Sequence, residues 1–198
     1  MINLFNFVSL LFMILLFTAC GGHPVTSSDK KNCPLLNKSM GPQWACEPQL
    51  AGGIAAVGLE PIDPHDHDIQ TKRATDNAIK ALDRQIFFKI KRILKNFSQL
   101  TGLGTDKFYK QLTIKLSQKV SQKIIADAKE VKLWSDPSNK DMYVLLAITP
   151  KTAHDVTKKE ILDALKANKN LWKKIDDKDG IDILLSQIQK EMNQRPNL

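Results

Sequence analysis

Apolar residues in the middle of the chain repeat with the spacing of one long amphipathic helix. They recur every three or four positions, so they share one helical face. These residues are Ala74, Ala78, Ala81, Leu82, Ile86, Ile90, Ile93 and Phe97. Asp68 or Thr71 is expected to cap the start of the helix. Because the stripe begins with small alanines, we expect this end of the helix to approach a sheet closely.

Three segments have the patterns of strands. A short apolar run between glycines at 52–58 is typical of a buried strand. The alternation at 129–134 and the apolar run at 142–148 predict a hairpin, because a polar turn at 135–140 separates them. The last strand is apolar on both faces, so we expect an antiparallel sheet with the order first, third, second. With the long helix covering one face, the predicted fold class is α+β.

Three shorter helices complete the pattern. Apolar residues at steps of four indicate a second helix from Phe108 to Ile124. A third begins at Pro150, a residue suited to the first turn of a helix, and continues to about Leu165. A linker that contains Trp172 leads to a terminal helix at 181–192.

Residues 1–19 are almost all apolar and contain no charged side chain. Such a segment is either an export signal or a membrane-spanning helix, because about 1.5 Å of rise per residue makes it just long enough to cross a bilayer. It ends in Thr18-Ala19-Cys20, which resembles the bacterial lipobox. That resemblance implies attachment of diacylglycerol to Cys20 and, since Gly21 follows, sorting to the outer membrane. An uncleaved helix and a plain secretory signal are the alternatives.

Export would change the interpretation of the other cysteines. Outside the cytoplasm, Cys33 and Cys46 are expected to form a disulfide. The alternative, a cysteine nucleophile, needs a base, and no histidine flanks either residue. Residues 20–41 are rich in Gly, Pro, Ser, Asn and Lys, which favours a flexible tether. The predicted organisation is a signal peptide at 1–19, a lipidated tether at 20–41, a domain at 42–166 and a helical extension at 167–198.

Composition adds a basic balance to this picture. The chain has 29 Lys and Arg against 21 Asp and Glu, a net charge of +8, and 42% hydrophobic residues, which is typical of a folded globular protein. Cations are concentrated between Lys72 and Lys95, and Lys115, Lys119 and Lys123 share a stripe of the second helix. These surfaces are either solvated helix faces or contacts for anionic headgroups, cell-wall polymers or an acidic protein. Nucleic acid is not an expected partner, because no aromatic residues interleave with the basic ones.

The loop before the long helix is the candidate for metal or catalytic chemistry. His65 and His67 alternate with Asp63, Asp66 and Asp68, and imidazole and carboxylate groups are metal ligands. No distant third ligand is evident, so no metal site, cofactor or catalytic residue is predicted. Acidic residues are also common in turns before helices. The sequence lacks the usual dinucleotide, phosphate-loop, zinc-protease and serine-hydrolase motifs.

Several short motifs occur in the order found in one lipoprotein family. They are the lipobox at Cys20, Pro42-Gln43-Trp44, Ala56-Val57-Gly58, the alanine-stepped helix, Trp134-Ser135-Asp136 and Tyr143-Val144-Leu145-Leu146. Over residues 42–165 the chain resembles the Lpp-twenty family of outer-membrane lipoproteins, which includes flagellar basal-disk lipoproteins. The resemblance implies a dodecin-like arrangement, in which a small antiparallel sheet wraps a helix.

Two function hypotheses follow. The first is a non-enzymatic, lipid-anchored protein of the outer membrane with a structural, assembly or binding role, for which the flagellum is one candidate location. In this hypothesis a sheet edge is a natural surface for a homo-oligomer. The second is a periplasmic domain that binds a ligand or metal, or hydrolyses a substrate, through the loop that contains His65 and His67. We favour the first, because the lipobox is the more specific signal.

Overall fold

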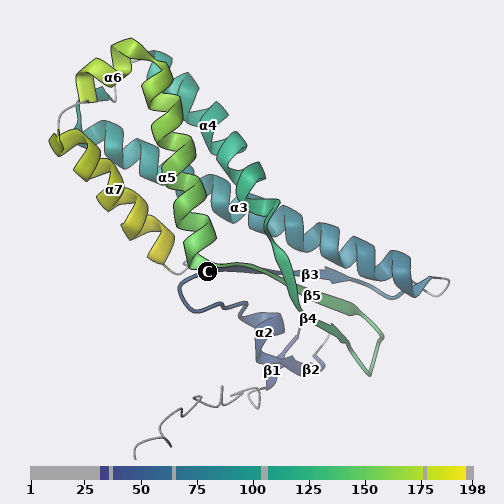
Figure 1. Ribbon diagram of the computed structural model, residues 1–198. Coiled ribbons are helices and arrows are strands. Elements are labelled where there is room, and N and C mark those ends of the chain that lie inside the picture. Colours follow the sequence, from purple (N-terminus) through teal and green to yellow (C-terminus); the bar gives the residue numbers. More distant parts are fainter. Residues whose placement is uncertain (1–31, 36–37, 64–65, 104–106, 176–177, 195–198) are drawn as a thin grey trace, which may run out of the picture. The chain divides into compact units, whose positions relative to one another are not determined.

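The computed structural model describes residues 32–35, 38–63, 66–103, 107–175 and 178–194 (Figure 1). Helices and strands alternate in the manner of an α+β protein. The elements are, in chain order, β1 (Asn32–Pro34), β2 (Met40–Pro42), α2 (Gln43–Cys46), β3 (Ile54–Glu60), α3 (His67–Leu100), α4 (Lys107–Ile125), β4 (Lys129–Ser135), β5 (Met142–Ile148), α5 (Pro150–Ala167), α6 (Lys169–Ile175) and α7 (Lys178–Asn193).

The three-stranded sheet has the order β3-β5-β4 and is antiparallel throughout. All seven residues of the central strand β5 are buried, which explains why its sequence lacks polar alternation. Ala56 lies opposite Leu146 on one side of β5, and Leu133 lies opposite Val144 on the other. The fold class and the strand order predicted from the sequence are confirmed.

One helix, α3, packs against both the sheet and the other long helices. It has 34 residues, and Figure 1 shows it passing the sheet before it continues beside α4 and α7. Asp66 caps its start, because one carboxylate oxygen accepts from the N–H groups of Asp68 and Ile69 at 2.8 and 3.0 Å. The expectation that Asp68 or Thr71 is the cap was wrong, since the first turn already begins at His67.

The first half of α3 lies very close to β3 at Gly58. Ala74 and Ala78 are fully buried at this contact. A Cβ atom added to Gly58 would lie 1.9 Å from the carbonyl oxygen of Ala74 and 2.3 Å from the amide nitrogen of Ala78. No side chain larger than a hydrogen fits between the two backbones. The alanines therefore permit the close approach expected of them, and a glycine on the strand completes it.

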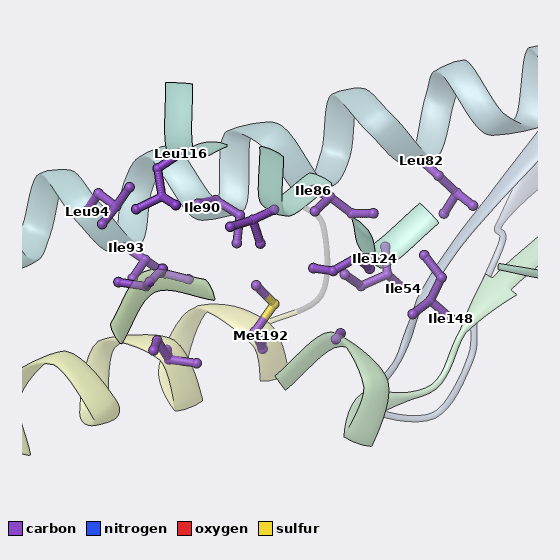
Figure 2. Packing of buried hydrophobic residues seen from close by; sticks show 14 of the residues in the cluster. Ile54, Leu82, Ile86, Ile90, Ile93, Leu94, Leu116, Ile124, Ile148 and Met192 are labelled. Atoms are coloured by element: carbon purple, nitrogen blue, oxygen red, sulfur yellow. The ribbon is translucent and has the colours of Figure 1, made fainter. Parts of the chain in front are cut away.

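A continuous cluster of buried apolar side chains joins the sheet to the helices. It includes Ile148 of β5, Leu82 of α3, Ile124 of α4 and Met192 of α7, which Figure 2 places around a common interior. Buried residues of α5 and α6 belong to the same cluster. The segment at 167–198, expected as an extension of the domain, thus contributes its described part to the main core.

Two cations of α3 bind the end of α7, in addition to the apolar packing between the two helices. Lys89 is only 2% exposed, and its ammonium donates to the carbonyl oxygens of Glu191 and Gln194 at 2.7 and 2.6 Å. Carbonyl groups at a helix end lack partners within the helix, so the lysine satisfies acceptors that need a donor. Burial is the main cause that lowers the pKa of Lys89. Arg92 adds an ion pair with the Glu191 carboxylate at 2.9 Å.

Two segments differ from the sequence-based expectations. The tether expected at 20–41 contains the strand β1 and the first two residues of β2, and Cys33 lies opposite Gly41 in this pair. The linker around Trp172 forms the helix α6, whose Leu171 and Ile175 are buried. In both segments the local composition favours a loop, whereas contacts with distant residues offset the entropy cost of ordering the backbone.

The contact at Gly58 gives a direct test of this packing. We expect Gly58→Ala to lower the free energy of unfolding by about 3 kcal/mol or more, because the added methyl group meets rigid backbone atoms. Gly102→Ala is the control. Gly102 has a positive φ of 72° and no atom within 4 Å of an added Cβ, so only the backbone cost of about 1 to 2 kcal/mol applies. Urea unfolding measures both, and equal losses for the two variants would contradict the proposed contact.

Candidate functional site

The structure separates the residues singled out by the sequence into three places. Cys20 and His65 lie outside the described residues. Cys33 lies in the β1–β2 hairpin and Cys46 in α2, and His67 lies at the start of α3. The basic residues, apart from the buried Lys89, are spread over the surface of α3 and α4.

A disulfide closes the N-terminal hairpin. It joins Cys33 of β1 to Cys46 of α2, whose Cα atoms are 6.4 Å apart. We call residues 32–53, within the described ranges, the N-terminal cover. The cover's Trp44 and Leu50 pack on the face of the sheet opposite α3. There they contact a small apolar cluster that consists of Ala55, Leu145 and Ala147. The sheet therefore has α3 on one face and the disulfide-closed cover on the other.

A buried carboxylate connects the cover to the sheet. Asp136 starts the turn between β4 and β5 and is 1% exposed. It accepts hydrogen bonds from the N–H and the hydroxyl of Ser138 at 2.8 and 2.6 Å, and another from the hydroxyl of Ser39 in the cover. One side chain thus shapes the β-turn and holds the N-terminal cover against it.

The loop before α3, which we call the acidic histidine loop, provides two acidic residues that stabilise the start of that helix. Asp66 caps the helix, and Asp63 forms an ion pair with Arg73 at 3.4 Å. His67 is the first residue of the helix and is exposed. Within the described ranges, no group of three or more His, Cys, Asp or Glu side chains lies close enough to hold a metal ion. The carboxylates of Asp63 and Asp66 thus have structural contacts of their own.

Another histidine lies beside a carboxylate on α5. The Nδ1 atom of His154 is 3.3 Å from a carboxylate oxygen of Asp155, and Lys151 pairs with the same carboxylate. The hydrogen bond from Lys151 is the main cause that lowers the pKa of Asp155. These side chains lie on the surface of the first turns of the helix, where an ion pair four residues apart supports the helix.

Each edge strand of the sheet has a feature that opposes pairing with a further strand. On β3, the side-chain amide of Gln85 donates to the carbonyl oxygen of Ala55 at 3.3 Å, and that of Asn77 donates to Leu59 at 2.9 Å. On β4, a bulge interrupts the pairing with β5. Capped carbonyls and bulges both oppose edge-to-edge association. The expected homo-oligomer stays a prediction, and these edges do not favour it.

A carboxylate of α5 partly balances the lysine stripe predicted on α4. Glu160 is 4% exposed and accepts from Lys123 and Lys119 at 2.6 and 3.1 Å. The hydrogen bond from Lys123 is the main cause that lowers the pKa of Glu160. These two lysines therefore connect α4 to α5, although both are exposed, as is Lys115 of the same stripe. The predicted stripe is not a uniform binding surface, because it faces an acid from a neighbouring helix.

A second group of cations remains on the outside of α3. Lys89, counted with them in the sequence, lies in the interior instead. The ion pairs that α3 forms within the described parts of the chain use Lys72, Arg73 and Arg92. Four other cations are exposed at intervals of four, seven and four residues, so they share one side of the helix. They are Lys80, Arg84, Lys91 and Lys95, and we call this side the α3 outer face.

Comparisons with known proteins add no relative. No protein-family model matches the chain, and no curated protein matches it. A proposal about its family therefore depends on the motifs of the chain itself. As for membrane spans, none of the helices in the described part of the chain combines the necessary length with the necessary apolar character.

Sequence reasoning missed the roles of three side chains. Asp136 had a local signal, because an Asp at the start of an Asp-Pro-Ser-Asn turn is typical of a residue that bonds to the backbone two positions on. Glu160 had none, since its partner Lys123 lies 37 residues away. Lys89 is equally without a signal, because the carbonyl groups that it binds are more than 100 residues distant.

The disulfide of the N-terminal cover is testable by its effect on stability. We expect the double variant Cys33→Ala and Cys46→Ala to lose about 3 kcal/mol of unfolding free energy, because the unfolded chain is no longer cross-linked. Reductant should lower the unfolding midpoint of the wild type towards that of the variant. The variant is its own control, since reductant has no bond to break there. A wild-type midpoint that ignores reductant would contradict the bond.

Proposed function

We propose that this protein is a bacterial lipoprotein, anchored to the outer membrane through Cys20, with a structural, assembly or binding role rather than an enzymatic one. One observation carries the proposal. The uncharged apolar run at 1–19 ends in two small residues followed directly by Cys20. A signal peptidase pocket accepts small residues, and a thiol at that position is the group that is acylated in lipoproteins.

Acyl chains on Cys20 would bind the protein to a bilayer strongly enough to keep it there. Each buried methylene of an acyl chain contributes about 0.8 kcal/mol, and two or more chains hold a protein stably on a bilayer. The disulfide between Cys33 and Cys46 supports export, because such bonds persist in oxidising compartments and are rare in the cytoplasm. The net charge of +8 favours contact with anionic surfaces.

Membership of the Lpp-twenty family is part of the same proposal. Its support is the lipobox, the motifs in their order along the chain, and the sheet wrapped on a long helix. Of the motifs, two have clear structural roles here. Gly58 of Ala56-Val57-Gly58 permits the contact with α3, and Asp136 of Trp134-Ser135-Asp136 holds the N-terminal cover. A flagellar location remains a prediction of the resemblance.

The contacts of the buried polar groups give no support to hydrolysis or metal binding. Asp136, Glu160 and Lys89 each join two elements of the fold. In the acidic histidine loop, Asp66 caps the helix and Asp63 forms an ion pair with Arg73. A group already committed to such contacts is less free to bind a ligand or transfer a proton. The alternative function through His65 and His67 therefore gains no support.

Substitution of Cys20 tests the anchor. We expect Cys20→Ala to abolish incorporation of a labelled fatty acid in growing cells and to remove the protein from outer-membrane fractions, because no thiol remains to be acylated. Ser27→Ala, a neutral change on the carboxyl side of the lipobox, is the control and should behave as wild type. Label retained on the Cys20→Ala protein, or an unchanged distribution between fractions, would contradict lipidation at this residue.

A further inference from the structure

Large apolar side chains lie exposed among the cations of the α3 outer face. Phe88 is 49% exposed, and Ile114 on the neighbouring helix α4 is 51% exposed. Phe87 stacks edge-on against Phe88 with ring centroids 5.5 Å apart. Single exposed apolar residues are common, but an aromatic pair between cations on one helix face is a specific arrangement.

These side chains surround a shallow groove between α3 and α4. Its volume is about 560 Å³, and it is lined by Lys80, Arg84 and the two phenylalanines on one side and by Gln118 and Gln122 on the other. Ile114 lies one helical turn before Gln118, and Lys91 one turn after Phe87 and Phe88. The groove and the α3 outer face therefore form one continuous surface.

The charge of this surface is strongly positive. Lys80, Arg84, Lys91 and Lys95 are all exposed. Asp83 is the acid that lines the groove, and its carboxylate accepts a hydrogen bond from Ser121 at 2.6 Å. Four cations against one acid leave the surface with unbalanced charge, in contrast to the lysines of α4 that face Glu160.

We propose that the α3 outer face and the adjoining groove dock on the headgroup region of an anionic phospholipid bilayer. Aromatic rings and long cationic side chains both favour that region, since rings bury their apolar part and cations meet phosphate groups. An acidic protein would use the cations but would leave the exposed aliphatic and aromatic groups without a matching surface. The inference rests on the proposed function, because the acyl anchor keeps the domain beside a bilayer.

A tryptophan placed on this surface reports the docking. The acylated full-length protein is reconstituted in neutral vesicles and in vesicles with phosphatidylglycerol, each with and without brominated acyl chains. We expect the extra emission of the Phe88→Trp variant, relative to wild type, to be quenched by bromine in the anionic vesicles and much less in the neutral ones. Leu100→Trp is the matched control, because Leu100 is exposed on another side of the same helix, and it should not be quenched.

Charge reversal tests the electrostatic part. Arg84→Glu with Lys91→Glu, combined with Phe88→Trp, should reduce the ratio of docked to undocked protein about 25-fold or more, since each cation near an anionic surface contributes about a five-fold factor. Lys158→Glu with Lys169→Glu gives the same net charge on α5 and α6 and should leave quenching intact. Sodium chloride at about 1 M, where the screening length falls to about 3 Å, should also abolish quenching.

Several results would overturn the inference. One is equal quenching of Phe88→Trp in neutral and anionic vesicles, and another is no quenching in either. Quenching that persists after Arg84→Glu with Lys91→Glu would also overturn the inference. An emission shift caused by soluble polyglutamate but not by the bilayer would assign the surface to an acidic protein instead. Flotation of the wild type with vesicles is scored separately, so a failed anchor is distinguished from a failed docking surface.

Discussion

The contact between Gly58 and the first half of α3 is the constraint on which the arrangement of this protein depends. The strand and the helix approach so closely that only a glycine fits on the strand, opposite the fully buried Ala74 and Ala78 of the helix. This fixes where the sheet lies on α3. The second half of the helix then extends beyond the sheet, where it provides the wall against which α4 and α7 complete the core.

The sequence was sufficient to predict the features that depend on local periodicity. The stripe that begins at Ala74 predicted α3, and the apolar run at 142–148 predicted the central strand, because burial on one or both faces leaves a regular pattern. It was not sufficient for features whose partners are distant in the chain. The cysteines of the N-terminal cover did predict its disulfide, but its order also depends on packing of Trp44 and Leu50 against the sheet and on the bond from Ser39 to Asp136, and neither contact alters the local composition.

Charge was the property that the sequence described least well. The positions of lysines and arginines along the chain predicted broad basic faces. In the structure, however, some of these cations are paired with acids or carbonyl groups of other elements and others are not. Lys89 is buried at the end of α7, and Lys119 and Lys123 face Glu160. What remains is a smaller surface on α3 and α4, where cations lie around the exposed ring of Phe88 and the half-buried ring of Phe87. A lipid anchor at Cys20 would confine this surface to the neighbourhood of a membrane, so that weak individual contacts act at high local concentration.

Mass spectrometry of the native protein, purified from its own membranes, is the decisive test of lipidation at Cys20. We expect the mature chain to begin at Cys20 and to carry a diacylglyceryl group on the sulfur, with no peptide from residues 1–19. A chain that still begins at Met1, or one whose Cys20 is an unmodified thiol, would contradict this expectation.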